Sequence, residues 1–309
     1  DTQERSYKGA LAYLSKLQRE DGLWPYTEKH DGALEPSCWA AIALRSDRAC
    51  LNRFLNQLLK LQNKDGGWSN DSARLSSDWT TGIALMTLRI LQSNANILAI
   101  DLDHESSEID QAIKHATDWL IDNRCQKYGP SARFALLLWK GPEYDYDRGW
   151  PWTQDTFDWV EPTAYALLAL RKLRFSEDEK FKRIISLAES YLLKLCCPQG
   201  GWNCGDRSPI GTVIPADMQF SALALLALAT KQTTPEVLKS IKLLQDRKME
   251  SRAECAWAGL ALRRFDKLTP NLRQQIIGGQ NSEGSLSTTI LTHSVACLAL
   301  ERGNIINLL

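Results

Sequence analysis

Acidic residues stand in front of several apolar segments of this chain, and Glu161 is the clearest example. It lies in the stretch DTFDWVEPTAYALLAL (155–170), where a proline follows it and an apolar run begins. Trp150 precedes Glu161 by eleven residues, and Trp24 precedes Glu35 by the same number. A carboxyl group in an apolar environment keeps its proton to a higher pH, because burial disfavours its charged form. Glu161 and Glu35 are therefore candidate general acids.

Five apolar segments begin with an acid, and four of these carry an aromatic residue one helical turn later. The acids are Glu35, Asp78, Glu161, Asp217 and Glu254, and the aromatic residues are Trp39, Tyr165, Phe220 and Trp257. This spacing places acid and ring on one helix face, and an aromatic face stabilises a nearby cation by about 0.5–2 kcal/mol. We predict catalytic roles for Glu161, Glu35 and Asp217, and a substrate pocket formed by Trp39, Trp79, Tyr165, Phe220, Trp257, Asp78, Glu254 and His293.

The same acids have a purely structural interpretation. Both Glu35 and Glu161 are followed by proline, and an acid followed by proline is common at the start of a helix. In that role each carboxylate would add about 0.3–1 kcal/mol through the helix dipole and would do no chemistry. The sequence leaves both interpretations open.

A repeated turn shows how these segments are arranged. LSKLQREDGLWPY (14–26) and LLKLQNKDGGWSN (58–70) match almost position for position, and LLKLCCPQGGWNC (192–204) repeats the frame with the glutamine displaced. Weaker copies occur at 148–152 and 278–286. Each copy follows a segment with the apolar spacing of an amphipathic helix, which the glycines end. The turn therefore joins two helices.

The helix after each turn is apolar on nearly all sides, which is typical of a helix buried among others. We expect such helices at 35–46, 78–91, 161–173, 217–230, 254–265 and 289–300. Recurrence of one helix pair about six times predicts an all-α fold, an (α/α)6 toroid whose inner apolar helices surround a central cavity. We expect residues 1–309 to form one domain, with an insertion at 125–148 in the third repeat that is either a helix or a strand.

The turn, with Gln, Gly and Trp after an outer helix, resembles the QW motif of the squalene–hopene cyclase and protein-prenyltransferase β-subunit superfamily, over roughly residues 7–300. The resemblance implies a toroid that binds isoprenoid chains. The family's cyclases carry their proton donor in a D-x-D-D-T-A motif, and Glu161 takes the donor's place in WVEPTA (159–164), with Trp159 and Pro162 replacing two carboxylates. By this resemblance the protein is a terpene cyclase-like enzyme, which starts carbocation cyclisation of a prenyl chain by protonating an epoxide or a polarised alkene.

Other readings remain open at this point. Protein prenyltransferases bind zinc through a D-x-C motif and a later His, and here Gln219 stands in place of the Cys, with Asp217 before it and His293 as the His. We therefore expect no zinc, and no cofactor in general. Magnesium is a weaker possibility, through Asp145, Asp147, Asp155 and Asp158. The alternative functions are a non-catalytic toroid that binds a lipid or a protein, and a prenyltransferase-like transferase or hydrolase.

The composition limits the kinds of molecule that we expect this protein to bind. Lys+Arg and Asp+Glu both number 37 in 309 residues, so a nucleic acid is not an expected partner. No apolar run approaches the roughly 20 residues that span a bilayer, which leaves only peripheral membrane contact. The eight cysteines form no disulfide framework, and the first residues are unlike a signal peptide. We expect a cytoplasmic protein that acts on an apolar isoprenoid molecule.

Overall fold

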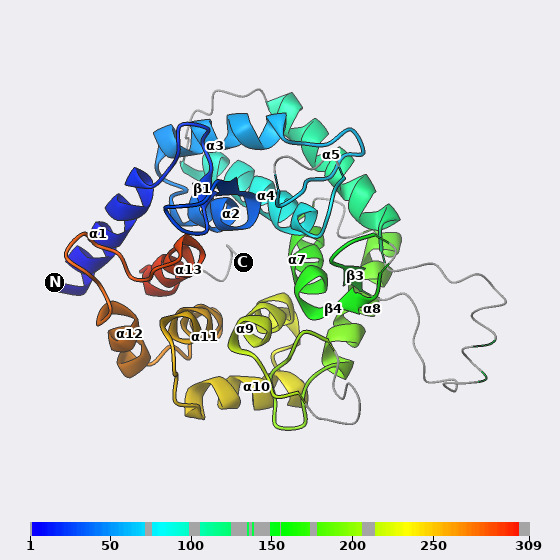
Figure 1. Ribbon diagram of the computed structural model, residues 1–309. Coiled ribbons are helices and arrows are strands. Elements are labelled where there is room, and N and C mark those ends of the chain that lie inside the picture. Colours follow the sequence, from blue (N-terminus) through cyan, green and yellow to red (C-terminus); the bar gives the residue numbers. More distant parts are fainter. Residues whose placement is uncertain are drawn as a thin grey trace.

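Helices alternate between an outer and an inner position along the chain (Figure 1). The computed structural model describes residues 2–71, 76–98, 106–124, 149–154, 156–173, 178–205 and 214–302, together with Ala135 and Leu138. Twelve α-helices form six pairs within these residues. The outer helices are α1 (Thr2–Lys16), α3 (Arg48–Lys60), α5 (Ser106–Asp122), α8 (Glu179–Lys194), α10 (Pro235–Asp246) and α12 (Pro270–Ile277).

The inner helices form a closed ring. They are α2 (Leu34–Ala43), α4 (Thr80–Leu98), α7 (Val160–Arg171), α9 (Met218–Ala227), α11 (Arg252–Arg264) and α13 (Ile290–Leu300), and a short 3₁₀ helix, η2 (Ala229–Lys231), follows α9. Each inner helix contacts the next, and α13 contacts α2. Every residue of α2 and of α13 is buried, as expected for helices that are apolar all round. The predicted α/α toroid is confirmed.

The same tryptophan contact recurs in four turns and binds each turn to the outer helix before it. The indole Nε1 of Trp24 donates to the carbonyl oxygen of Leu14 at 2.8 Å, and Trp68 bonds to Leu58 at the same distance. Trp150 and Trp202 make equivalent bonds to the outer helices before them. Each indole therefore binds a carbonyl in the last turn of an outer helix, where carbonyl oxygens lack the usual partner four residues later.

In three of the turns a glutamine links the pair to the next outer helix. Gln18 donates from Nε2 to the carbonyl oxygens of Gly22 and Cys50, both at 2.9 Å, so the first turn is bound to α3. Gln280 makes the same contacts in the last turn, to Gly284 at 3.0 Å and to Ser6 of α1 at 2.8 Å. The last turn therefore docks on the first helix, which closes the ring.

Two short hairpins separate the turn from the inner helix in the first and third pairs. Strand β1 (Trp24–Pro25) pairs with β2 (Gly32–Ala33), and β3 (Trp150–Pro151) pairs with β4 (Asp158–Trp159), both antiparallel. The hairpins lie over the N-terminal ends of α2 and α7 (Figure 1). They explain why the interval from tryptophan to acid is the same in these two pairs.

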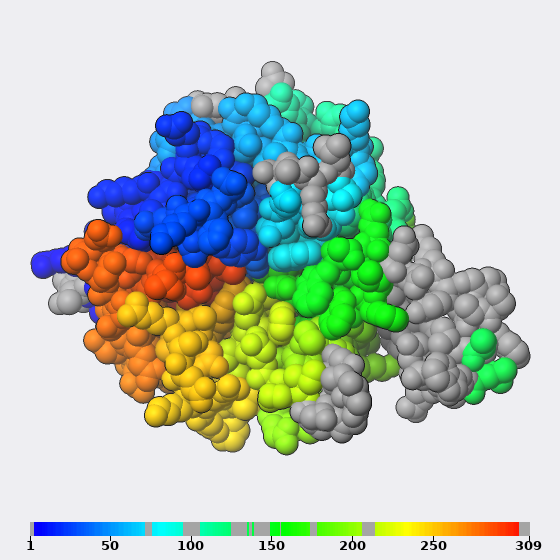
Figure 2. Space-filling view, in the orientation of Figure 1, coloured from blue at the N-terminus to red at the C-terminus, as the bar shows by residue number. Residues whose placement is uncertain are grey.

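The observed inner helices agree with the predicted segments to within a few residues at their starts. The expected insertion at 125–148 lies outside the described residues except for Ala135 and Leu138. No helix in the described ranges is both long and apolar enough to cross a membrane. Seen in the space-filling view, atoms of successive helix pairs meet around the centre of the ring (Figure 2).

Alanine at Gly284 is expected to weaken ring closure. Gly284 has a φ of 102°, and a Cβ atom there would lie 2.6 Å from the backbone oxygen of Gly9 in α1. A left-handed backbone costs a non-glycine residue about 1–3 kcal/mol, so Gly284→Ala should lower the free energy of unfolding by at least that amount.

The matched control is Gly9→Ala, on the other side of the same contact. Its Cβ would meet only Gln280, at 3.8 Å, and alanine favours a helix interior by about 1 kcal/mol relative to glycine. Urea unfolding of both variants measures the difference. Equal loss of stability in the two variants would contradict this account of closure.

Candidate active site

Glu161 is a buried acid whose carboxyl group contacts two other elements. It is the second residue of α7, and 7% of it is exposed. Trp152, in the β3–β4 hairpin, donates from Nε1 to Oε2 at 3.0 Å, and Gln219, at the start of α9, donates from Nε2 to Oε1 at 3.1 Å. The carboxyl group is thus held between the hairpin and the neighbouring inner helix rather than capping its own helix.

Glu35 has the equivalent place at the start of α2 and is 4% exposed. The hydroxyl of Tyr26 donates to Oε2 at 2.6 Å, and that of Tyr165 donates to Oε1 at 3.2 Å. The two hydroxyls in turn accept bonds from Asn70 and Trp39, both at 3.1 Å. Because those nitrogen groups only donate, each chain of hydrogen bonds runs toward Glu35.

The two acids are related by the repeat. Tyr26 follows the turn Trp24 by two residues, as Trp152 follows Trp150, and in both cases this side chain donates to the acid nine residues later. The second donor to Glu35 is Tyr165, which lies on α7 one turn after Glu161. The two carboxyl groups therefore share one neighbourhood at the same mouth of the ring.

Burial controls the charge of this pair. It raises the pKa of Glu161 to about 8, with a further contribution from the negative charge of Glu35. Burial also raises the pKa of Glu35, against the hydrogen bonds from Tyr26 and Tyr165. Ionisation of either carboxyl makes ionisation of the other more costly, so the pair titrates as a unit. Burial and this coupling therefore favour a protonated carboxyl in the pair at neutral pH.

Aromatic rings surround the pair. Trp79 stacks on Tyr165 with ring centroids 5.6 Å apart and planes 24° apart, and Trp152 stacks on Trp159 at 4.8 Å and 16°. Trp79, Trp152 and Trp159 are half-buried, so they form the outer part of the site. Phe220, at the start of α9, is half-buried as well.

Trp39 and Trp257 lie deeper and are fully buried, like Tyr165. The sequence placed all three around an open cavity. In the structure they pack on one another instead, with Trp39 next to both Tyr165 and Trp257. Spacing along one helix shows which residues share a face, and does not show whether that face meets space or another ring.

Three of the predicted acids make structural contacts. Asp217 is exposed, and its Oδ1 accepts from the backbone N–H groups of Gln219 and Phe220 at 2.8 and 3.1 Å, which is helix capping. Asp78 similarly accepts from Thr80 at the start of α4.

Glu254 pairs with Arg247 at 3.2 Å and accepts from the backbone of Glu250 at 2.6 Å. These contacts give Glu254 a structural role that does not involve the Glu161–Glu35 pair. For Asp217, Asp78 and Glu254 the structural interpretation is therefore sufficient.

His293 has a structural role that its sequence context did not reveal. Its Nδ1 accepts from the backbone N–H of Leu286 at 3.0 Å, and its Nε2 lies 3.0 Å from the carbonyl oxygen of Ala10. In four other pairs a hydroxyl oxygen has this role and accepts from the backbone N–H of the turn tryptophan; these hydroxyls belong to Ser37, Thr81, Thr163 and Ser221. Burial lowers the pKa of His293, so the ring is neutral, with its proton on Nε2.

A metal site is not found in the part of the chain that the structure describes. No three His, Cys, Asp or Glu side chains come together there in a way that could hold an ion. Asp145, Asp147 and Asp155 lie outside the described residues, and Asp158 accepts from the backbone N–H of Gly149 at 2.8 Å. None of the seven described cysteines forms a disulfide.

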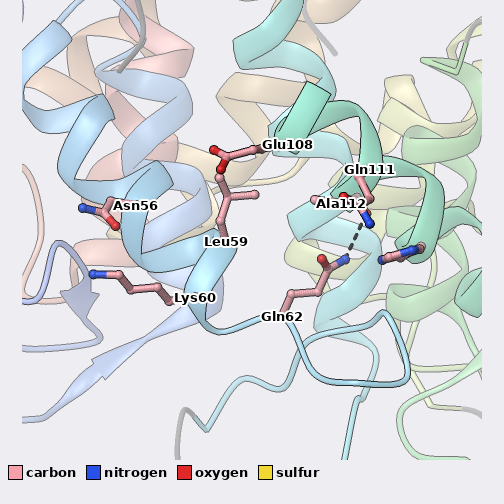
Figure 3. Close-up of a pocket in the computed structure, with 8 residues that line it drawn as sticks. Asn56, Leu59, Lys60, Gln62, Glu108, Gln111 and Ala112 are labelled. Atoms are coloured by element: carbon pink, nitrogen blue, oxygen red, sulfur yellow. Dashed lines mark hydrogen bonds between the residues drawn. The ribbon is translucent and has the colours of Figure 1, made fainter. Parts of the chain in front are cut away.

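A second depression lies on the outer wall, between α3 and α5 (Figure 3). It is lined by Asn56, Leu59, Lys60, Gln62, Glu108, Gln111, Ala112 and His115. At its edge Gln62 donates to the carbonyl oxygen of Ala112 at 2.9 Å, which is the link from the second turn to the next outer helix. This depression is a seam between repeats, and we assign it no function.

Sequence reasoning missed Tyr26, Trp152 and Asn70 as part of the site. A signal for the first two was present, since an aromatic residue follows the turn tryptophan by two positions in both pairs that carry the buried acids. Gln219 was noted only where a zinc ligand would stand, whereas the structure shows that it binds Glu161.

Comparison with solved structures identifies the fold in enzymes of two kinds. The chain is similar to type II terpene cyclase MstE from Scytonema in complex with its substrate, geranylgeranyl dihydroxybenzoate, with a TM-score of 0.62, 14% identity and 96% of each chain covered. It is also similar to an inactive variant of an α-1,6-mannanase of Salegentibacter sp. HEL1_6 in complex with α-1,6-mannotriose, with a TM-score of 0.66, 9% identity, and 96% of this chain and 97% of that chain covered.

The comparisons therefore establish an α/α toroid fold, which a terpene cyclase and a mannanase share, and they do not identify the reaction. At these identities a shared fold does not carry a shared activity. No protein-family model and no curated protein matches the sequence.

The raised pKa of Glu161 predicts a pH-dependent stability. Unfolded Glu161 ionises near 4.5, whereas in the folded chain it holds its proton up to about pH 8. Between these values the folded state binds more protons, so the free energy of unfolding falls as pH rises, by up to about 1.4 kcal/mol per pH unit. Glu161→Gln cannot ionise in either state, so its stability relative to the native protein should increase from about pH 5 to about pH 8.

Urea unfolding at a series of pH values measures this. Asp178→Asn is the control, because the exposed Asp178 only caps α8. Parallel pH profiles of the native protein and Glu161→Gln would show that Glu161 is ionised in the folded state.

Proposed function

We propose that this protein is an enzyme that protonates an isoprenoid substrate at the Glu161–Glu35 pair and starts carbocation chemistry there. The observation that carries the proposal is the buried Glu161, whose pKa is raised by burial, beside aromatic faces. A general acid must hold its proton at working pH and lie within reach of the substrate. We place the substrate on the outer side of the pair, beside the half-buried rings of Trp79, Trp152 and Phe220.

The proposed reaction needs no further reagent. The π electrons of an alkene, or an oxygen lone pair of an epoxide, form a new bond to the Glu161 proton, which leaves a carboxylate and a developing cation. Cyclisation moves the cation along the chain. Transfer of a proton from carbon back to a carboxylate of the pair forms the final alkene and restores the starting charge, so no atom is gained or lost.

Aromatic faces and the second carboxyl stabilise the charge that develops. Trp79 and Tyr165 present a stacked pair close to Glu35, and cation–π contacts are worth about 2 kcal/mol or more when desolvated. Trp152 and Gln219 donate to Glu161 and so stabilise the carboxylate that remains after proton transfer. Because a carboxyl with a pKa of about 8 is a weak acid, an epoxide or a polarised alkene is the proposed reactive group.

The terpene cyclase neighbour supports an isoprenoid substrate. Its complex holds geranylgeranyl dihydroxybenzoate in the same fold. The mannanase neighbour holds an oligosaccharide, so the fold alone is compatible with both kinds of ligand. The apolar and aromatic surroundings of the pair favour the isoprenoid.

A non-catalytic binding toroid is the second candidate. The observation that favours it is that all four oxygens of Glu35 and Glu161 already accept hydrogen bonds from the protein. In that case the pair would be a polar junction between helices, and the mouth would bind an apolar ligand without changing it.

Substitution of Glu161 by glutamine separates the two candidates. General acid catalysis contributes about 10²–10⁴-fold to a rate, so Glu161→Gln should lower product formation by this factor while the helical circular dichroism is unchanged. The assay is product analysis by mass spectrometry after incubation with geranyl, farnesyl and geranylgeranyl alcohols, diphosphates and terminal epoxides. Asp178→Asn should retain native activity, because it changes a distant cap.

Undiminished turnover by a folded Glu161→Gln protein would exclude Glu161 as the acid. Unchanged binding of a prenyl alcohol to both proteins, with no product from either, would favour the binding toroid.

A further inference from the structure

Asn70 fixes the direction of one hydroxyl proton beside the carboxyl pair. Its side-chain Oδ1 accepts from the backbone N–H of Glu35 at 3.0 Å, and its Nδ2 donates to the Tyr26 hydroxyl at 3.1 Å. A backbone N–H can only donate, so the amide of Asn70 cannot turn round without losing this bond. The Tyr26 oxygen therefore accepts from Asn70, and its own proton is directed to Glu35, at 2.6 Å.

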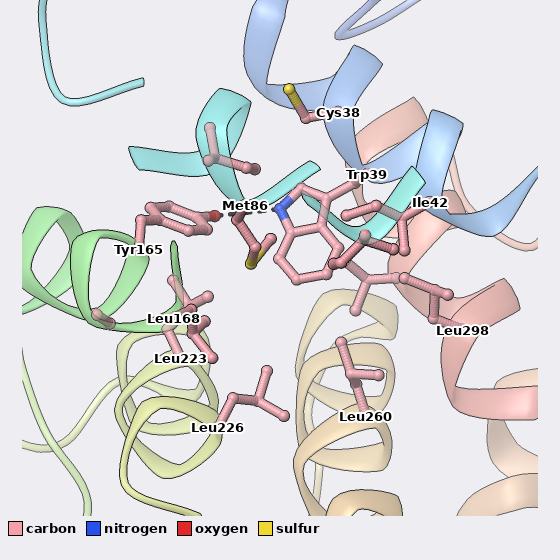
Figure 4. Packing of buried hydrophobic residues seen from close by; sticks show 14 of the residues in the cluster. Cys38, Trp39, Ile42, Met86, Tyr165, Leu168, Leu223, Leu226, Leu260 and Leu298 are labelled. Carbon is pink, nitrogen blue, oxygen red and sulfur yellow. Dashed lines mark hydrogen bonds between the residues drawn. The ribbon is translucent and has the colours of Figure 1, made fainter. Parts of the chain in front are cut away.

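A second chain of hydrogen bonds reaches Glu35 from the inner helices. Figure 4 shows the indole nitrogen of Trp39 directed at the hydroxyl of Tyr165, to which it donates at 3.1 Å. An indole N–H also only donates, so the Tyr165 proton is directed to Glu35, at 3.2 Å. Both oxygens of Glu35 thus receive hydroxyl protons whose direction is fixed by a third group. Such hydrogen bonds favour the ionised carboxylate.

Glu161 is bound by one donor whose direction is not fixed. Nε2 of Gln219 donates to Oε1 of Glu161 at 3.1 Å, and within the described ranges this is the one hydrogen bond of that side-chain amide. A half-turn of the amide would bring its oxygen to the same place, where it would accept the proton of a neutral carboxyl. The surroundings of Glu161 therefore accommodate either charge state, whereas those of Glu35 favour the ionised one.

Nearby charges act in the same direction. Burial and the negative charge of Glu35 are the largest effects on Glu161, and both raise its pKa; the charge of Asp217 adds to them. Burial also raises the pKa of Glu35, but the next effects there are the hydrogen bonds from Tyr26 and Tyr165, which lower it. The proton of the pair is therefore more stable on Glu161 than on Glu35.

The repeat provides an internal comparison for Asn70. The backbone N–H of Leu34 donates to the carbonyl oxygen of Asn70 at 3.4 Å, and that of Val160 donates to the carbonyl oxygen of Cys204 at 3.0 Å, so Asn70 and Cys204 hold equivalent places. In the second case the hairpin donor to the acid is the indole of Trp152, which can only donate. An orienting amide is thus present beside the tyrosine hydroxyl, which could donate or accept, and is replaced where the donor needs no orientation.

We infer that Asn70 is a positioning residue that keeps the negative charge of the pair on Glu35 and the proton on Glu161. It acts through the hydroxyl of Tyr26. The assignment of charge rests on the hydrogen bonds, whereas its use in a reaction rests on the proposed function. Without Asn70 the hydroxyl could turn away from Glu35, and Glu35 could take the proton that Glu161 needs in order to act as an acid.

The first experiment measures the pKa of Glu35 where it is the only carboxyl of the pair, in a Glu161→Gln protein. NMR of carbon-13-labelled glutamate carboxyls over a pH series gives this value, and the resonance is assigned by its loss in Glu35→Gln. Asn70→Asp keeps the acceptor for the backbone N–H and places a second acceptor in front of Tyr26. The hydroxyl proton is then drawn to residue 70, so the pKa of Glu35 should rise by about one unit or more.

A double-mutant cycle shows whether Asn70 acts through Tyr26. Tyr26→Phe alone should also raise the pKa of Glu35, and most of the rise caused by Asn70→Asp should disappear when residue 26 is already Phe, because only the added charge then remains. Asn56→Asp, the same change on the exposed side of α3, is the control that should leave this pKa unchanged. No rise in Asn70→Asp, or a rise of equal size without the Tyr26 hydroxyl, would overturn the inference.

Product formation by the protein with both acids separates this inference from the proposed function. If the protein is the proposed enzyme, Asn70→Asp should lower kcat at neutral pH by about tenfold or more, because one pKa unit is a tenfold change in protonation. A shifted pKa of Glu35, with no turnover by the native protein, would support the role of Asn70 and count against the enzyme. Native turnover together with an unshifted pKa of Glu35 would support the enzyme and exclude this role for Asn70.

Discussion

Closure of the ring is the constraint on which the site depends. Gln280 binds Ser6, and His293 joins the turn of the sixth pair to Ala10, so the end of the chain is fastened to its first helix. This places α13 against α2 and buries α2 completely. If the ring were open, Glu35 would lie on an uncovered helix and would behave as an ordinary ionised carboxylate. Closure therefore determines the pKa values of the pair, and through them its chemistry.

The repeat explains why two acids, and not five, share the site. In the first and third pairs a hairpin carries an aromatic donor, Tyr26 or Trp152, over the start of the inner helix. This donor draws the acid away from its own helix end. Asp78 and Asp217 instead accept backbone N–H groups at the starts of their own helices. Equivalent positions of the repeat thus support both capping and a buried pair, and the local loop decides between them.

Much of this architecture was predictable because its causes are local. Apolar periodicity locates the inner helices, and glycine and tryptophan mark the turns, so six pairs and a closed toroid follow from the sequence. The positions of Glu35 and Glu161 at helix starts follow in the same way. Their protonation does not, because it depends on burial by elements far away in the chain.

The partners of the site could not be predicted for the same reason. Trp39 and Tyr165 are 126 residues apart in sequence, and their contact fills space that either helix pattern alone would allow to be open. His293 resembled a ligand because Leu286, which replaces a turn tryptophan, concealed the relationship with Ser37 and Thr163. The contacts of Tyr165 and His293 are thus determined by long-range packing, which no local sequence pattern reveals.

The strength of Glu161 as an acid follows from two opposed effects. Burial keeps it protonated at neutral pH, and the same burial makes the carboxylate left behind costly. Trp152 and Gln219 offset part of that cost by donating to both oxygens, and a cation formed nearby offsets more of it through direct attraction. The proton is therefore released most readily when positive charge develops close to the carboxyl and is retained otherwise. Such coupling suits a substrate whose reactive end is held against the pair.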